Sequence, residues 1–259
     1  MTFTEVQIST FLASVFWPFV RISSIFLSMP LLSNNQVTTK FKIVLAVSIT
    51  WVVYPTLQAP PEVDVFSAEA LLILVQQVAI GILIGFMLQF AFGALAVAGE
   101  MIGYSMKLGM AKMADPINGI QVPIVTTLYF TLGTLVLLAL DIHLVLLQLL
   151  IDSFIIFPVA VDGITHNTFW DVVGWASRMF EIGVLMSLPI IGSILLLDIS
   201  MGVVQRAAPQ MHIFAIGFPI TLIAGLLLIW LTLPAVFDLF VDAMNEILLF
   251  IRDVLFAKK

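Results

Sequence analysis

The chain has 259 residues, of which 61% are hydrophobic and only 10% are charged, and its formal net charge at pH 7 is −6. Because soluble domains carry roughly 25% charged residues, this composition indicates an integral membrane protein. The negative balance without a basic cluster argues against nucleic acid as a partner, and the absence of cysteine excludes disulfides and thiolate metal sites.

The hydrophobic runs predict an all-α membrane protein, since a helix that crosses a bilayer needs about 20 apolar residues. The first ten residues lack the positively charged region of a cleavable signal peptide, so we expect the first run to remain in the mature protein. About six hydrophobic helical segments are expected in a single membrane domain, 1–259, at residues 11–29, 43–57, 71–98, 123–140, 172–197 and 213–237.

One further apolar run, residues 144–161, leaves two alternatives open. It is interrupted by Asp152 and Pro158, and it follows the run 123–140 after a short polar turn. Residues 123–161 therefore form either one span with an interfacial piece or a bent helical hairpin.

The C-terminal tail from Asp238 onward has a different pattern. Apolar residues between Phe237 and Leu255 recur at three- and four-residue steps, and the acidic residues fall mainly on the other side. This pattern predicts an amphipathic helix that lies on a partner or at the membrane interface instead of spanning the bilayer.

Basic residues mark alternate linkers and so predict a topology. Lys40 and Lys42, then Lys107 and Lys112, then Arg206 lie in linkers that acidic linkers separate. The positive-inside rule places these three linkers in the cytoplasm and the N-terminus outside. Six spans then leave the C-terminus outside as well, a position that the two terminal lysines fit poorly.

The stretch 99–121, GEMIGYSMKLGMAKMADPINGIQ, is neither a hydrophobic span nor an ordinary polar loop. It contains four glycines and four methionines, and uncharged apolar sequence flanks it on both sides. Glycine lets the backbone bend or approach a neighbour closely, and methionine is an adaptable apolar filler. The stretch is predicted either to line a lumen or gate, or to be a cytoplasmic loop whose lysines follow topology alone.

Two GxxxG pairs occur in and before this stretch, at Gly81/Gly85 and at Gly99/Gly103. Small residues at this spacing let two helices approach closely in a membrane. Such pairs are frequent in apolar sequence, so they predict tight helix packing and nothing more specific.

Isolated charged residues inside apolar runs are expected to face a protein interior, because exposing a charge to lipid is costly. Arg21 is expected either to pair with an acidic group on another helix or to extend to an interface. Asp141 is expected to belong to a helix end and not to a metal or proton-relay pair with His143, because residues two apart lie on different sides of a helix.

Two charge pairs are predicted from spacing alone. Arg178 and Glu181 are three residues apart and favour an intrahelical pair. Asp198 and Arg206 are eight residues apart, so they share a face if the segment is helical, and we expect a structural salt bridge between them.

The sequence contains none of the common catalytic signatures: no GxSxG, HExxH, Walker loop or GxGxxG. We therefore predict no enzyme and no catalytic, cofactor-binding or metal site. A secondary transporter of a small solute is the alternative function, because a helix broken near Pro189 or at 141–144 is typical of such proteins. The lack of an inverted repeat and the few buried charges argue against it.

Three segments carry a resemblance to a known family: GEMIGYSMKLGMAKMADP at 99–116, LALDIHL at 138–144 and RAAPQMHIFAIGFP at 206–219. In this order and spacing they resemble the FliR family of flagellar type III secretion export-gate proteins over nearly the whole chain. Two positions depart from the family pattern, in which an Asn is common where His212 stands and a Lys where Thr221 stands.

The resemblance implies a non-enzymatic subunit without a cofactor, in the bacterial inner membrane and the flagellar basal body. One such chain joins FliP and FliQ in a spiral of helical hairpins, with part of the assembly above the membrane plane, around a pore for unfolded rod, hook and filament proteins; FlhB associates with it. About residues 1–190 resemble a FliP-like portion, and about 190–259 resemble a FliQ-like hairpin and tail.

The resemblance also implies roles for particular residues. In this family the Gly/Met-rich loop helps to plug the pore, and deletion of residues 107–116 is expected to raise ion leak while assembly is kept. The implied plug or gate residues are Met106, Lys107, Gly109, Met110, Lys112, Met113, Asp115 and Pro116. The implied structural or assembly residues, with Glu100 and Asp115 fixing the ends of the plug, are Arg21, Gly99, Glu100, Gly103, Asp141, Asp198, Arg206, Pro209, Gln210, Phe214, Gly217 and Pro219.

Overall fold

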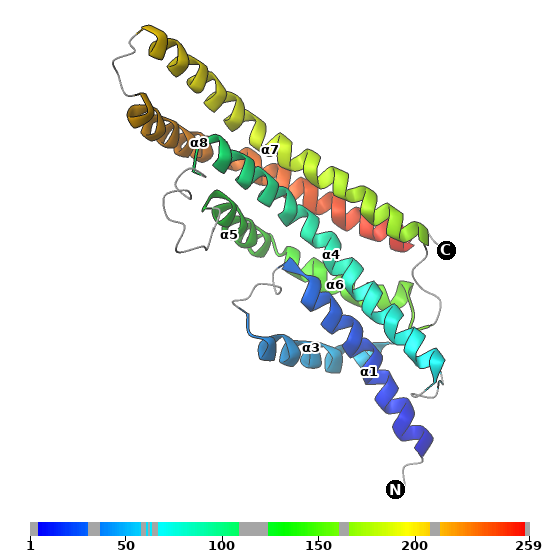
Figure 1. The fold of residues 1–259 in the computed structure, drawn as a ribbon. Helices are drawn as coiled ribbons and strands as arrows, with labels where there is room; N and C mark the ends of the chain where they lie inside the picture. Colours follow the sequence, from blue (N-terminus) through cyan, green and yellow to red (C-terminus); the bar gives the residue numbers. More distant parts are fainter. Residues whose placement is uncertain are drawn as a thin grey trace. The chain divides into compact units, whose positions relative to one another are not determined.

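A computed structural model gives the fold, and it describes residues 5–30, 37–57, 61, 63, 67–108, 124–160, 166–207 and 213–256. Within these ranges the chain is helical apart from short turns and has no strand, which confirms the all-α prediction. The elements are α1 (Glu5–Ser28), α3 (Thr39–Val53), the short helix η1 (Tyr54–Thr56), α4 (Ala68–Ser105), α5 (Ile124–Ala139), α6 (Ile142–Ile156), α7 (His166–Ala207) and α8 (Ile213–Phe256) (Figure 1).

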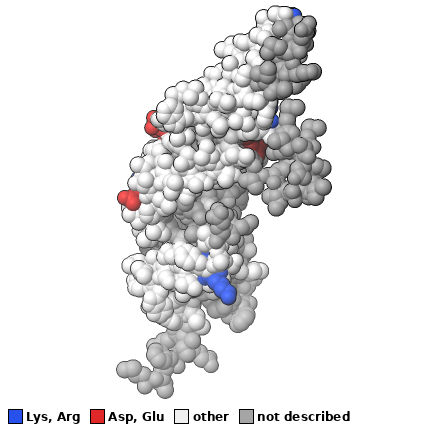
Figure 2. All heavy atoms as spheres, turned by 90° about the vertical axis from the view of Figure 1, so that its left-hand side faces the viewer, with Lys and Arg blue, Asp and Glu red and all other residues white. Residues whose placement is uncertain are grey.

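The helices confirm an integral membrane protein. Four of the described helices are long and apolar enough to cross a membrane, and the bent pair α5 and α6 makes a fifth candidate if it counts as one span. Helix α3 has only 15 residues, fewer than the roughly 20 that a span needs. The second of the six expected segments is therefore a short helix. On the face drawn in Figure 2, most of the described surface is uncharged.

Within residues 123–161 the structure describes two helices, α5 and α6, separated by a sharp bend, and both alternatives stay predictions. Helices α5 and α6 meet at an angle of 73°. The bend contains Asp141, whose φ of 55° lies in the left-handed region. A non-glycine residue is uncommon there, so this position marks a fixed turn and not a frayed helix end.

Two helices extend further than the sequence patterns indicate. Helix α4 continues to Ser105, so residues 99–105 of the Gly/Met-rich stretch are helical. Helix α8 runs without a break from Ile213 to Phe256. The prediction of a separate tail helix is therefore wrong, although its two-faced character is confirmed: the acidic residues Asp238, Asp242 and Asp253 are exposed, and Phe240, Met244, Leu248 and Ile251 are buried.

The chain forms two compact units, each built from segments that are distant in sequence. The first contains residues 1–90, 140–175 and 246–259, and the second contains residues 91–139 and 176–245. The division near residue 190 that the family resemblance implies stays a prediction.

In the first unit, two glycines of α4 let α1 pack closely. A Cβ added to Gly81 would lie 2.7 Å from the carbonyl oxygen of Arg21 and 2.6 Å from the Cβ of Ser24. A Cβ added to Gly85 would overlap the side chain of Ser28. The close approach predicted from this GxxxG pair is therefore confirmed.

In the second unit, the other GxxxG pair is used at one position only. A Cβ on Gly99 would lie 2.6 Å from the Cα of Thr126 in α5, whereas a Cβ on Gly103 would meet nothing within 4 Å. A third glycine, Gly183 of α7, would place its Cβ 2.8 Å from the Cβ of Val97 in α4. Helix α4 is thus approached closely from more than one direction, which suits a helix that is apolar on all sides.

Replacing Gly81 with alanine tests the α1–α4 contact. We expect Gly81→Ala to lower the free energy of unfolding by about 1–3 kcal/mol, because the nearest backbone oxygen cannot move aside without shifting α1. Gly103→Ala is the matched control, since its new methyl group meets open space and alanine favours a helix over glycine by about 1 kcal/mol. Thermal unfolding in detergent measures both, and equal unfolding temperatures would contradict the prediction.

Candidate functional site

The Gly/Met-rich stretch is the candidate functional segment, and the structure describes its first part, residues 99–108. Several residues implied as plug or assembly positions lie outside the described ranges: Gly109, Met110, Lys112, Met113, Asp115, Pro116, Pro209 and Gln210. The same holds for His212, and the side chain of Phe214 is likewise outside the described set. The site is therefore built from Met106 and Lys107 and the residues that hold them.

The C-terminus of α4 is closed by a defined hydrogen-bonding pattern in which Lys107 follows the helix. The N–H of Leu108 donates to the carbonyl of Gly103 at 3.1 Å, and the N–H of Lys107 donates to the carbonyl of Tyr104 at 3.0 Å. These two bonds form a Schellman motif, in which the residue after the helix adopts a left-handed conformation and is usually glycine. Here that residue is Lys107, with a φ of 61°, so the site keeps a conformation that a lysine adopts only at some cost.

An ion pair holds Lys107 in this position. Its ammonium group lies 2.7 Å from a carboxylate oxygen of Asp198 in α7, and both side chains are 36% exposed. The expected salt bridge between Asp198 and Arg206 is therefore wrong: both residues lie on α7 as predicted, but Asp198 pairs with Lys107, and Arg206 is exposed. A pair this exposed contributes about 0–1 kcal/mol, so it positions the segment without fixing it strongly.

Apolar contacts reinforce the end of α4. Met106 is fully buried, and a Cβ on Gly225 of α8 would lie 2.6 Å from two of its side-chain carbons. One turn earlier, the hydroxyl of Ser187 in α7 donates to the sulfur of Met101 at 3.6 Å. The start of the Gly/Met-rich stretch is thus attached to α7 and α8 within the second unit.

Arg21 forms the centre of a separate buried cluster in the first unit. Both of its expected placements are wrong, because its side chain is fully buried and has no carboxylate partner among the described residues. Its guanidinium donates to the side-chain oxygen of Gln77 at 2.8 Å and to the carbonyl oxygens of Ser153 and Phe157, both at 2.8 Å. It also lies 4.3 Å from the ring centroid of Phe154, a cation–π distance.

The remaining implied positions are more ordinary. Asp141 stands at the start of α6, so the helix-end interpretation is confirmed, although its side chain makes no capping hydrogen bond. Arg178 and Glu181 form the predicted pair at 2.8 Å. Glu100 and Pro219 are exposed and Gly217 is buried.

Thr221, one of the two departures from the family pattern, is fully buried in α8. Its hydroxyl donates to the carbonyls of Gly217 at 3.1 Å and Phe218 at 3.0 Å. A small residue that bonds to its own helix needs no external partner, whereas a lysine at the same place would need to extend out of the packed region or find an acceptor.

Among the described residues, no three His, Cys, Asp or Glu side chains lie close enough together to hold a metal ion. Besides the Arg21 cluster, the described residues provide helix ends, close glycine contacts and two partly exposed ion pairs, Lys107–Asp198 and Arg178–Glu181. Their chemistry is that of positioning a segment.

Comparison with known proteins decides the family. The chain matches the family described as bacterial export proteins, family 1, over residues 12–247. The flagellar biosynthetic protein FliR of Escherichia coli (strain K12) is 35% identical over 252 residues, covering 97% of this chain and 96% of that protein. The chain belongs to the FliR family of bacterial export proteins. FliR of Pectobacterium carotovorum subsp. carotovorum is 33% identical, covering 95% and 98%, and FliR of Bacillus subtilis (strain 168) is 27% identical, covering 89% and 92%.

Sequence reasoning missed two residues of this FliR-family chain that hold Arg21. Gln77 and Ser153 are uncharged polar residues in apolar runs, and both are fully buried. The signal in the sequence was a pair of polar residues inside each apolar run, Gln76 and Gln77 in one and Asp152 and Ser153 in the other. The sequence analysis expected an acidic partner for Arg21 and so did not predict these neutral ones.

Removing the Arg21 guanidinium tests whether it holds the first unit together. We expect Arg21→Met to lower the free energy of unfolding by about 3 kcal/mol or more, because it leaves buried acceptors without a donor. The free energy of unfolding of Arg21→Lys should lie between those of the wild type and Arg21→Met, since an ammonium cannot reproduce the planar fork of donors. Arg206→Met, at an exposed cation, is the control. Thermal unfolding in detergent compares them, and equal stability of the two methionine variants would overturn the structural role of Arg21.

Proposed function

We propose that this protein is a non-enzymatic subunit of the flagellar type III export gate in the bacterial inner membrane, within the basal body. With FliP and FliQ it forms the pore through which unfolded rod, hook and filament proteins leave, and FlhB associates with the assembly. Similarity along nearly the whole chain to proteins named flagellar biosynthetic protein FliR is the observation that carries the proposal. The apolar, largely uncharged helices support it, because they suit a subunit surrounded by lipid and by other helices.

The Gly/Met-rich stretch acts in this proposal as part of the plug that closes the pore. Its N-terminal end is the helix end at Lys107, which is attached to α7 through Asp198 and to α8 through Met106. A deformable seal needs a firm base, and methionine side chains after that base can repack around different polypeptides. Residues 109–116, which lie outside the described residues, are the part of the stretch that we propose as the seal.

The assembly is tested by native mass spectrometry of the full chain after co-expression with its FliP-like and FliQ-like partners. We expect one copy of this chain inside a larger hetero-oligomer, because the proposed pore is built from several kinds of subunit. Expression of this chain alone is the control and should yield no comparable assembly. A stable monomer or homodimer in the presence of well-expressed partners would contradict the proposal and favour a solute transporter.

The plug is tested by measuring ion conductance of the purified complex in planar bilayers. Asp198→Asn and Lys107→Gly each remove the ion pair between these two residues. Lys107→Gly also removes the conformational cost of a left-handed backbone at a non-glycine residue. Because a half-exposed pair is worth about 0–1 kcal/mol, each should raise the resting conductance by no more than about fivefold. Deleting residues 109–116 should raise it much further, because the seal itself is lost.

Asp238→Asn, at an exposed acid on α8, is the control for the conductance measurements and should leave them unchanged. An unchanged conductance after the deletion, with the complex intact, would contradict the plug. Loss of the complex itself would show instead that residues 109–116 are needed for assembly.

A further inference from the structure

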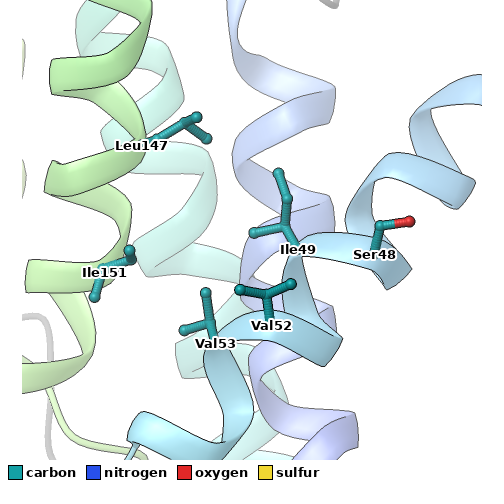
Figure 3. A pocket seen from close by; sticks show the side chains of 6 residues that line it. All are labelled: Ser48, Ile49, Val52, Val53, Leu147 and Ile151. Atoms are coloured by element: carbon teal, nitrogen blue, oxygen red, sulfur yellow. The ribbon is translucent and has the colours of Figure 1, made fainter.

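A hollow of about 290 Å³ lies between α3 and α6 in the first unit (Figure 3). Leu147 and Ile151 of α6 point toward Ile49 and Val53 of α3 across it. The residues that line it are Ser48, Ile49, Val52, Val53, Leu147 and Ile151.

The hollow offers nothing polar to a bound water molecule. Ser48 is the one lining residue with a polar side chain, and its hydroxyl donates to the carbonyl of Val44 in its own helix at 2.8 Å. A buried water needs two to four polar partners, so the hollow does not bind water stably. An apolar occupant, in contrast, restores the dispersion contacts that the lining side chains lack.

An apolar strip leads from the hollow along α3 to a cation. Lys42, Leu45, Ile49 and Val52 recur at steps of three and four, so they lie on one side of the helix. The strip extends over about 15 Å at the rise of an α-helix. Val52 is 73% exposed and the other three are half-buried, so the strip is open to a molecule that lies along it.

The cation at the end of the strip has no acidic partner among the described residues. Neither Lys40 nor Lys42 takes part in an ion pair with any residue that the structure describes, and α3 contains no acidic residue. A lysine next to an apolar membrane-embedded surface attracts the headgroups of anionic lipids. A hollow that favours a hydrocarbon therefore continues into a position that favours a phosphate.

We propose that α3 and α6 bind one anionic phospholipid, with its phosphate at Lys42 and one acyl chain along the strip into the hollow. This assignment is independent of the export function.

Native mass spectrometry of the full chain in detergent, with added palmitoyl-oleoyl phosphatidylglycerol or phosphatidylcholine, tests the proposal. The wild-type chain should retain phosphatidylglycerol more strongly than phosphatidylcholine. Lys42→Gln should reduce this preference by about fivefold, the effect of one lysine near an anionic surface. Lys40→Gln should leave the preference unchanged, because residues two apart lie about 200° from each other around a helix.

A second pair of variants tests the hollow itself. Ile49→Trp fills it and should abolish retention of both lipids, whereas Val47→Trp, on the opposite side of α3 and half exposed, should not. Unchanged retention in Ile49→Trp, or equal preferences in the two lysine variants, would overturn the proposal.

A photoreactive benzoylphenylalanine at Ser48, in the complex co-expressed with its partners, distinguishes the occupants. An adduct of phospholipid mass supports the proposal. An adduct with another polypeptide would overturn it, because a protein subunit would then cover the hollow.

Discussion

The guanidinium of Arg21 lies inside a candidate membrane span and donates to oxygen atoms of Gln77 in α4 and of Ser153 and Phe157 at the end of α6. In a bilayer, a backbone carbonyl released at a helix end has to find a donor within the protein. The positive charge also interacts favourably with the negative end of the α6 dipole. The C-terminal end of α6 can therefore lie among apolar segments, because Arg21 of α1 supplies the hydrogen-bond donors for its carbonyls. Neutral acceptors can satisfy the buried guanidinium because there are several of them.

The second unit depends on close approach instead of charge. Gly99, Gly183 and Gly225 stand where a Cβ would overlap a neighbour, and the partners come from α5, from α4 and from the end of α4 respectively. Helices α5, α7 and α8 thus all pack closely against α4 or its C-terminal end. These contacts also fix the position of Lys107, the residue that follows the helix. The Lys107–Asp198 pair is half exposed and contributes little, so packing contributes more than electrostatics to the position of the end of α4.

Local patterns in the sequence predicted what depends on local geometry: the helices, the Gly81/Gly85 contact and the Arg178–Glu181 pair. They failed where partners are distant or chemically unexpected. Arg21 bonds to neutral residues up to 136 positions away, and Lys107 pairs with Asp198 across 91 positions, which no spacing rule encodes. The end of α4 was missed because a lysine takes the left-handed position that normally calls for glycine. The continuity of α8 was missed because the pattern changes at Asp238 from uniformly apolar to two-faced, although the helix continues through that point.

The sequence separations around Arg21 also set an order of events during synthesis. Gln77 follows Arg21 by 56 residues and Phe157 follows it by 136. At a synthesis rate of 5–20 residues per second, the last acceptor emerges about 7–27 s after Arg21. Throughout that interval α1 carries a cation whose transfer to the centre of a bilayer costs about 2.5–3.5 kcal/mol. The hydrogen bonds that satisfy Arg21 can therefore form in full only after α6 has been made.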